Sequence, residues 1–233
     1  MSTLVKICGL NAQDAVDAAL EAGTDMVGFV VFDRSPRHVS LDQAASLGAR
    51  VGSSAARVLL TVDADDASLA AAIAALDPAF LQLHGTETPE RVAAIRAGFG
   101  VKVIKAIGIG ARADLDLIRG YDEIADMLLF DALPHPDATR PGGNGAGFNW
   151  SLLAGVATKK PWLLAGGLDA GNVGQALRET RAPGVDVSSG VESAPGVKDK
   201  GKIAEFIAVV RAARPDRGGS DRWEKLGLAR VSV

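Results

Sequence analysis

Short apolar runs alternate with alanine-rich stretches along almost the whole chain, a spacing typical of parallel strands joined by crossover helices. Strands are predicted at residues 4–8, 26–32, 57–63, 80–84, 101–107, 127–131, 162–165 and 185–187. Helices are predicted at residues 14–21, 41–47, 67–76, 89–97, 113–119, 171–178 and 202–213, and a long loop, 132–148, follows the sixth strand. Such a run of strand–helix units in 233 residues predicts the α/β class and a single (β/α)₈ TIM barrel. A doubly wound open sheet is the alternative that spacing alone leaves open.

The polar residues of the predicted strands favour the barrel. Side chains alternate between the two faces of a strand, and in several strands the polar residues share one face while aliphatic residues take the other. These polar sets are Lys6/Cys8, Arg57/Thr61/Asp63, Gln82/His84, Asp131 and Asp186/Ser188. In a barrel the aliphatic face meets the helices. We expect the polar face to line the mouth at the carboxyl ends of the strands, where active sites lie.

One domain accounts for most of the chain. We expect residues 1–213 to form the barrel as a catalytic domain, and residues 214–233 to form a polar, exposed C-terminal extension. Within the first unit, Asn11 is expected to cap the helix and Gly23 to end it.

Charge and cysteine content narrow the classes of function. The net charge of −3 argues against nucleic acid or a membrane surface as a partner. No apolar run approaches the ~20 residues of a membrane helix. Lys6 and Asn11 interrupt the apolar run near the amino terminus, so no signal peptide is predicted. A single cysteine cannot form an internal disulfide and favours a reducing compartment, so we expect a cytoplasmic protein.

Glycine-containing loops after three strands are candidate anion sites. Gly166 and Gly167 follow the seventh strand, and Ser189 and Gly190 follow the eighth. In barrels the loops at these two positions commonly bind phosphate, because glycine lets backbone amides approach an anion closely. The alternative is that these glycines only form turns. The four glycines of residues 140–147, in the loop after the sixth strand, suit either a lid or simple flexibility.

Charged side chains that follow other strands are candidate ligand contacts. Arg34 and Arg37 follow the second strand, and a guanidinium group presents a planar fork suited to carboxylate or phosphate. Both arginines could equally be solvated. His84 ends the fourth strand and is either an acid, base or orienting group or a hydrogen-bonded core histidine.

Cys8 and Asp131 are the candidates for proton transfer. They end the first and sixth strands. A buried, inert thiol is the default for a free cysteine, but Lys6 on the same face should stabilise the thiolate and lower its pKa from about 8.5. We therefore predict that Cys8 and Asp131 are base and acid across one pocket. The histidines show no metal-ligand spacing, and the sequence contains no P-loop or dinucleotide-binding motif.

The motifs at the strand ends also form a recognisable set. In chain order they are Lys6-Ile7-Cys8-Gly9, Arg34-Ser35-Pro36-Arg37, Gln82-Leu83-His84-Gly85, Leu129-Phe130-Asp131, Ala165-Gly166-Gly167-Leu168 and Gly184-Val185-Asp186-Val187-Ser188-Ser189-Gly190-Val191-Glu192. Together they resemble the phosphoribosylanthranilate isomerase family, from the first strand to about residue 213. The resemblance implies a (β/α)₈ barrel that catalyses an Amadori rearrangement in tryptophan biosynthesis. The substrate N-(5-phosphoribosyl)anthranilate becomes 1-(2-carboxyphenylamino)-1-deoxyribulose 5-phosphate.

The resemblance further implies a role for each site residue. Cys8 is the general base, Asp131 the general acid, and Arg37 holds the anthranilate carboxylate. The remaining substrate-binding residues are Gly142, Gly143, Gly166, Gly167, Ser189 and Gly190 around the phosphate, together with His84 and Asp186. The family uses no cofactor and no metal, its partner is a small phosphorylated substrate, and we expect a monomer or homodimer. Ring opening needs a proton that an aspartic acid can donate, and the Schiff base must then lose the C2 proton, which a thiolate can take.

Two departures and two alternatives accompany this interpretation. Relatives carry threonine or serine where this chain has Asn144, and aspartate where it has Asn149. Asparagine caps a helix about as well as aspartate, so Asn149 should keep the capping role. Another phosphosugar barrel, indole-glycerol-phosphate synthase, lacks support because no glutamate at a strand end partners Lys6. A barrel that only binds a phosphometabolite would need neither Cys8 nor Asp131.

Overall fold

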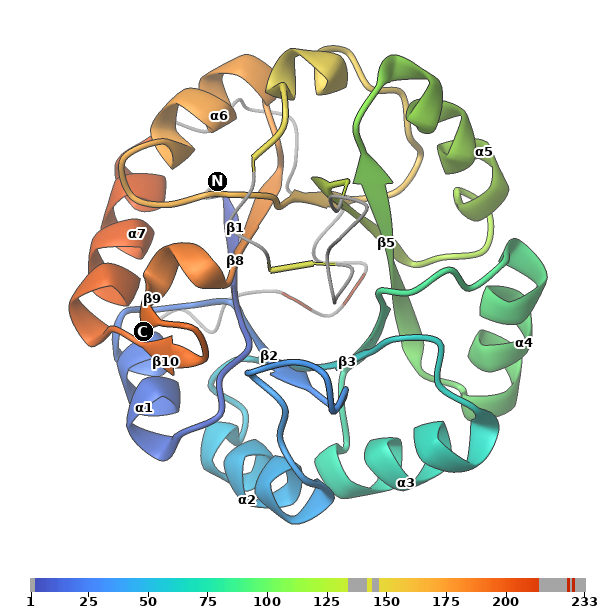
Figure 1. The fold of residues 1–233 in the computed structure, drawn as a ribbon, viewed down its shortest axis with the longest axis vertical. Helices are drawn as coiled ribbons and strands as arrows, with labels where there is room; N and C mark the ends of the chain where they lie inside the picture. Colours follow the sequence, from blue (N-terminus) through green and yellow to red (C-terminus); the bar gives the residue numbers. More distant parts are fainter. Residues whose placement is uncertain (1–2, 134–141, 144–146, 214–225, 227, 229–233) are drawn as a thin grey trace.

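Eight parallel strands close into a barrel in the computed structural model (Figure 1). The structure describes residues 3–133, 142–143, 147–213, 226 and 228. Each strand pairs in parallel with the next one along the chain, and β1 pairs with β8 to close the ring. The strands are β1 (Leu4–Cys8), β2 (Met26–Val30), β3 (Ala56–Thr61), β4 (Phe80–Leu83), β5 (Lys102–Ile109), β6 (Met127–Ala132), β7 (Trp162–Leu164) and β8 (Gly184–Val187). The predicted (β/α)₈ barrel is confirmed and the open sheet is excluded.

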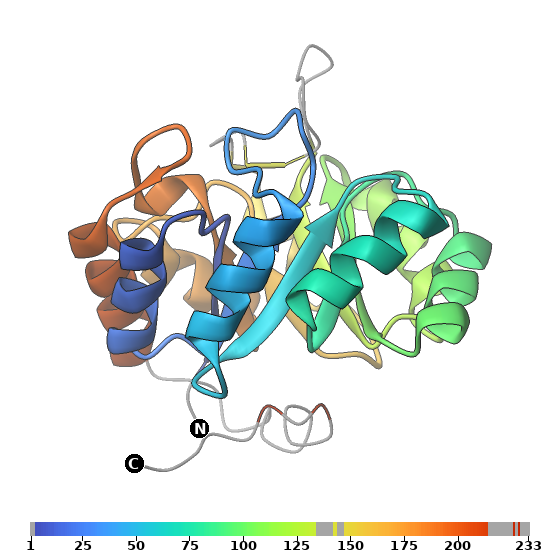
Figure 2. The same cartoon turned by 90° about the horizontal axis from the view of Figure 1, so that it is seen from below.

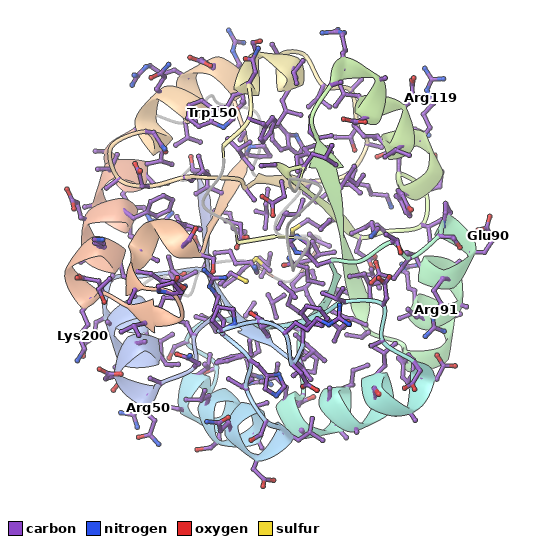
Figure 3. All side chains as sticks on the ribbon, in the orientation of Figure 1. Arg50, Glu90, Arg91, Arg119, Trp150 and Lys200 are labelled. Carbon is purple, nitrogen blue, oxygen red and sulfur yellow. The ribbon has the colours of Figure 1, made fainter. Side chains whose placement is uncertain are left out.

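Helices surround the barrel as an outer ring (Figures 1 and 2). They are α1 (Gln13–Glu21), α2 (Leu41–Val51), α3 (Asp66–Leu76), α4 (Pro89–Phe99), α5 (Ile118–Tyr121), α6 (Val173–Thr180) and α7 (Lys200–Ala212). Charged side chains of this ring, such as Arg50, Arg119 and Lys200, point away from the barrel axis (Figure 3). No helix among the described residues is both long enough and apolar enough to cross a membrane.

Two of the strand–helix units differ from the regular pattern. In the fifth unit a 3₁₀ helix, η1 (Arg112–Leu117), precedes the single turn of α5. The Asp114 carboxylate accepts the backbone N–H groups of Gly110 and Ala111 and holds this tight turn. In the described part of the sixth unit the helical segment is η2 (Trp150–Leu153), whose first turn Asn149 caps by accepting the Ser151 N–H. The capping role predicted for Asn149 is therefore confirmed.

Side-chain caps set the starts of several helices. Ser40 and Gln43 form a reciprocal capping box on α2, and Thr88 caps α4 directly before Pro89. The prediction for Asn11 is wrong, because Ala12 occupies the cap of α1 without a side-chain bond and Asn11 Nδ2 instead donates to Gly196 O at 3.0 Å. Gly23 follows α1 with φ +80°, as expected for a residue at a helix end.

The interior of the barrel is apolar over its amino-terminal part. Its side chains come from alternate residues of the strands: Leu4, Met26, Val58, Phe80, Ile104, Ala106, Met127, Leu129, Leu163 and Ala165. The predicted parity of β3 is wrong, because Val58 and Leu60 face inward. Arg57 faces outward and its Nε donates to Asp77 O at 2.9 Å. A parallel strand that is buried on both faces is apolar on both. A few polar residues therefore do not show which of its faces points into the barrel.

The described part of the C-terminal extension contacts the amino-terminal end of the barrel (Figure 2). Leu226 and Leu228 are half-buried against the interior cluster that contains Leu4 and Met26. Lys102, at the start of β5, donates from Nζ to Leu226 O at 2.7 Å. These two leucines therefore lie at the end of the barrel opposite the loops that follow the strands.

We expect truncation after Ala213 to leave a folded, active protein with a lower melting temperature. The truncation removes the partial burial of Leu226 and Leu228, which stabilises the fold by roughly 1–3 kcal/mol. A thermal melt of the two forms should show a decrease of several degrees. The full-length double variant Leu226→Ser and Leu228→Ser is the matched comparison, because it removes only these apolar contacts. Identical melting temperatures for all three proteins would show that the contact contributes nothing.

Candidate active site

The thiol of Cys8 lies above a buried ion pair inside the barrel. Lys6, two residues earlier on the inward face of β1, is fully buried, and its Nζ contacts Asp186 Oδ1 on β8 at 2.7 Å. Such burial is tolerated because the charge is paired and hydrogen-bonded. Gly28 of β2 is the register partner of Cys8. A β-carbon at position 28 would lie 2.8 Å from Cys8 Sγ, so glycine provides the space for the thiol.

Burial raises the pKa of the Cys8 thiol above its ordinary value. The nearby Lys6 charge acts in the opposite direction, but Asp186 adds a further upward shift. Lys6 thus lowers the pKa of the thiol as expected, but the predicted net decrease is wrong, because desolvation of the thiol and the Asp186 charge outweigh this effect. Burial also acts to lower the pKa of Lys6, but Asp186 and Cys8 together outweigh it, so that pKa is raised. Lys6 thus stays charged beside the thiol.

Asp131, one residue before the end of β6, faces the barrel interior and pairs with His84. His84 Nε2 lies 3.2 Å from Asp131 Oδ2, and Gln82 Nε2 lies 2.8 Å from His84 Nδ1. If the Gln82 amide donates to Nδ1, the imidazole proton is on Nε2 and points at the carboxylate. Asp131 Oδ1 accepts the N–H of Ala132 at 2.8 Å. The carboxyl group is thus held from both sides at the mouth of the barrel.

Three glycines approach these groups closely. A β-carbon at Gly142 would lie 2.6 Å from His84 Nε2 and 2.8 Å from Asp131 Oδ2, and one at Gly143 would lie 2.5 Å from Arg37 Nη1. Gly166 has φ +84°, and its β-carbon would lie 3.2 Å from Asp131 Oδ1. Two adjacent residues of the sixth loop, Gly142 and Gly143, therefore cover the His84–Asp131 pair and Arg37 respectively. Residues 134–141 and 144–146 of this loop lie outside the described residues. They include Asn144 and most of the stretch for which a lid and simple flexibility were the two alternatives.

Arg37 is buried and paired, not solvated. Its Nε and Nη2 contact the two carboxylate oxygens of Glu192 at 2.6 Å and 2.8 Å. Lys198 Nζ contacts the same carboxylate at 2.8 Å. Burial favours a higher pKa for Glu192, but Arg37 and Lys198 outweigh it, so the pKa of this carboxyl is lowered.

Burial has the dominant effect on Lys198 and lowers its pKa, although Glu192 opposes the change. Sequence reasoning assigned no role to Glu192 or Lys198. Glu192 is the last residue of the Gly184–Glu192 motif, so the motif could have indicated that Glu192 belongs to the site. Lys198 lies in a hairpin that the hydrophobic pattern does not predict, and only the folded chain brings it to the site.

The predicted phosphate loops lie against each other. Gly190 packs so closely on Leu168 that any β-carbon there would overlap the Leu168 carbonyl. Gly167 has φ +64°, and its carbonyl accepts Asn172 Nδ2 at 2.8 Å. Ser189 begins the 3₁₀ turn η3 (Ser189–Val191). The turns after β7 and β8 therefore form one glycine-lined surface at the carboxyl end of the barrel.

The arrangement defines a class of protein. A (β/α)₈ barrel holds a buried thiol on β1 and a carboxyl group on β6, with a cationic arginine and glycine loops at the same end. Groups of these types in this place suit an enzyme that moves protons on an anionic small molecule. Among the described residues no three His, Cys, Asp or Glu side chains are grouped so that they could hold a metal ion.

Comparison with known proteins gives the particular family. The family model for N-(5'-phosphoribosyl)anthranilate isomerase matches residues 5–209. The chain is 62% identical over 211 residues to the N-(5'-phosphoribosyl)anthranilate isomerase of Beijerinckia indica, covering 91% of this chain and 95% of that relative. It is 56% identical over 213 residues to that of Rhodopseudomonas palustris, covering 91% of this chain and 100% of the relative. The chain belongs to the N-(5'-phosphoribosyl)anthranilate isomerase family and is an isomerase of tryptophan biosynthesis.

Solved structures agree with this assignment. The Thermotoga maritima phosphoribosyl anthranilate isomerase has a TM-score of 0.81 at 31% identity, covering 90% of this chain and 99% of that one. The Thermus thermophilus isomerase has a TM-score of 0.79 at 29% identity, covering 91% and 100%. A phosphoribosyl anthranilate isomerase in complex with reduced 1-(o-carboxyphenylamino)-1-deoxyribulose 5-phosphate has a TM-score of 0.75 at 28% identity, covering 90% and 99%.

We expect the reaction of Cys8 with iodoacetamide to titrate at a higher pH in the folded protein than in the denatured chain. Burial raises the pKa of this thiol, and only the thiolate reacts. The rate measured from pH 6 to 11 should therefore have a midpoint above that of the same chain in denaturant. Because Cys8 is the only cysteine, mass spectrometry reports this site alone. A midpoint below the denatured value would show that the cations, not burial, dominate.

We expect Gly142→Ala to fold normally and to lose about 10²-fold in kcat. The new methyl group would displace the His84–Asp131 pair, because its β-carbon falls within 2.8 Å of both partners. Gly98→Ala is the matched control, since a β-carbon at Gly98 meets nothing within 4 Å. Steady-state kinetics of the two variants decide the point, and equal kcat values would show that the loop glycine is dispensable.

Proposed function

We propose that Cys8 and Asp131 are the general base and general acid of the isomerisation. The observation that supports this most directly is their placement at the carboxyl ends of β1 and β6, on the inward face of each strand. A base and an acid at separate points of one mouth can reach different atoms of a bound sugar. The substrate of this proposal is N-(5-phosphoribosyl)anthranilate and the product is 1-(2-carboxyphenylamino)-1-deoxyribulose 5-phosphate.

The first step opens the ribose ring. Asp131 donates a proton to the ring oxygen, the bond from that oxygen to C1 breaks, and the nitrogen lone pair forms a C1=N bond. His84 keeps the carboxyl group in place through the 3.2 Å contact to Oδ2. In this proposal His84 orients the Asp131 carboxyl group rather than reacting with the substrate. Its hydrogen bond with Gln82 holds the imidazole in place for that role.

The second step removes the proton on C2. The Cys8 thiolate takes it, the electron pair forms a C1=C2 bond, and the nitrogen recovers its lone pair. The resulting enolamine tautomerises to the C2 ketone with two hydrogens on C1. A raised pKa makes the thiolate less abundant but a stronger base once formed. Lys6, held by Asp186, keeps a positive charge beside the thiolate. Asp186 therefore acts indirectly in this proposal, by positioning Lys6.

The anionic ends of the substrate have separate places in this proposal. Arg37, buried beside Gly143, binds the anthranilate carboxylate. The phosphate lies on the glycine surface formed by Gly166, Gly167, Ser189 and Gly190, where backbone N–H groups can donate. Gly142 and Gly143 lie between the acid and the arginine, and would place the reacting carbons between the two ends.

Location and assembly follow by inference. A small phosphorylated substrate and a single buried thiol suit the cytoplasm, where thiols stay reduced. The chain acts as a monomer or a homodimer; one similar structure is of monomers generated from the dimeric Thermotoga maritima enzyme. A barrel that only binds a phosphometabolite is less consistent with the site, because binding requires neither the thiol nor the His84–Asp131 pair.

We expect Cys8→Ser and Asp131→Asn to fold and to lose roughly 10²–10⁴-fold in kcat. A hydroxyl is a far weaker base than a thiolate, and an amide cannot donate the first proton. Activity is followed by the fluorescence decrease of phosphoribosylanthranilate generated in situ, and circular dichroism verifies the fold. Both variants should still bind the product, because the carboxylate and phosphate contacts remain. Wild-type turnover by folded Cys8→Ser would make the thiol structural.

A further inference from the structure

A small hairpin outside the barrel brings two charged residues to Arg37. It consists of β9 (Glu192–Ala194) and β10 (Val197–Lys198), and follows the η3 turn after β8. Glu192 and Lys198 are register partners across this hairpin. The side chains of Arg37, Glu192 and Lys198 are all nearly or fully buried, with exposed fractions of 4%, 5% and 0%. A buried charge group of this kind must have each of its charges accounted for.

The hydrogen-bonding capacity of Glu192 and Lys198 is fully used. Glu192 Oε1 accepts from Arg37 Nε and Lys198 Nζ, and Oε2 accepts from Arg37 Nη2 and the Gly196 N–H. Lys198 Nζ has three donors, and it contacts Glu192 Oε1, Ser188 O and Ser188 Oγ at 2.8, 2.9 and 3.3 Å. Neither side chain has an acceptor or donor left for a substrate.

Arg37 keeps one edge for a ligand. Its Nε and both Nη2 protons are directed to Glu192 and Gly143 O, whereas Nη1 makes no hydrogen bond to the described residues. Gly9 and Gly143 lie against the side chain so closely that a β-carbon at either would overlap it. The guanidinium group is therefore fixed in orientation, and Nη1, which lies next to Gly143, is the nitrogen whose hydrogen-bonding capacity is left for a ligand.

The charges of the group lead to the same conclusion. Two cations and one carboxylate leave a single positive charge, which matches one carboxylate of a ligand. We propose that Glu192, anchored by Lys198, is a positioning residue that holds Arg37 so that its Nη1 edge binds the carboxylate on the aromatic ring of the substrate. This inference rests on the proposed function, and it extends that function to a residue that need not touch the substrate.

Two effects of removing the Glu192 charge oppose each other. Loss of the negative charge makes the group more positive, which by Coulomb's law alone would strengthen carboxylate binding. Loss of the bidentate contact lets the guanidinium turn, which weakens binding by misplacement. If Glu192 is a positioning residue, the second effect is the larger one, so the sign of the change in affinity is the test.

We expect Glu192→Gln to raise KM by roughly 10–100-fold while kcat changes much less. The amide keeps the size of the side chain but cannot accept at both oxygens. Asp126→Asn is the matched control, because Asp126 holds Arg96 with the same two-oxygen geometry, at 3.0 and 2.9 Å, next to the amino-terminal end of β6. That variant should lower the melting temperature without changing KM. An unchanged or lower KM in Glu192→Gln would overturn the proposal.

A double-variant comparison separates positioning from general stability. If Glu192 acts only through Arg37, adding Glu192→Gln to Arg37→Ala should change KM by less than about 3-fold. A further increase equal to that of the single variant would show an effect independent of Arg37 and overturn the proposal. Glu192→Asp keeps the charge and should recover part of the affinity, and it provides the measurement if the glutamine variant does not fold.

A ligand pair makes the test independent of turnover. Calorimetry with reduced 1-(2-carboxyphenylamino)-1-deoxyribulose 5-phosphate should show weaker binding to Glu192→Gln than to the wild type. The corresponding phenylamino compound, which lacks the carboxylate, should bind both proteins equally. Equal losses for both compounds would overturn the positioning role. Failure of the wild-type chain to bind either compound or to turn over substrate would instead overturn the proposed function.

Discussion

The ion pair between Lys6 and Asp186 connects the closure of the barrel to its chemistry. The two residues are register partners on β1 and β8, the strands that close the ring, and their side chains meet at 2.7 Å inside it. Removing one partner of a buried pair costs about 3–5 kcal/mol, because the other charge is left uncompensated. The same pair lies next to the Cys8 thiol and affects its pKa. The barrel therefore cannot lose this interaction without also altering the proposed base.

The second constraint on the site is space. Gly28 leaves room for the thiol and Gly142 for the carboxyl group of Asp131, while Gly143 leaves room for the guanidinium of Arg37 and Gly9 for its aliphatic part. Each of these four glycines lies where a methyl group would overlap a side chain of the site. The polar groups at the mouth can then approach one another and a ligand while the aliphatic layer below them stays closely packed.

The hairpin after β8 shows how a barrel acquires polar groups that its strands do not supply. The carboxyl ends of the strands provide Cys8 and Asp131, and His84 directly follows β4, but the carboxylate that fixes Arg37 comes from Glu192 in the hairpin. Asn11, in the loop after β1, donates to Gly196 O at the hairpin turn, and Lys198 joins the hairpin to Ser188. Loops from three strands are thus connected around one arginine, which is how a guanidinium group can be buried at a mouth.

Local patterns in the sequence determined much of this protein. Apolar spacing predicted the eight strands, and the polar residues near their carboxyl ends favoured the barrel over an open sheet. Ser40, Thr88 and Gly23 acted as the cap and stop signals that their types indicate. The motifs at the strand ends also contained Cys8, Asp131 and Arg37. These features are readable because each depends on neighbours a few residues away.

Only the tertiary structure decided the partners and electrostatics of those residues. Three features depend on residues that are distant in the chain. They are which side chains of β3 face inward, the contact of Asn11 with Gly196, and the contact of Leu226 with the amino-terminal end of the barrel. The direction of the Cys8 pKa shift depends on a balance between burial and charges on β1, β8 and the hairpin. The sequence places Lys6 beside the thiol. The burial of the thiol and the pairing of Lys6 with Asp186 arise only when the ring is closed.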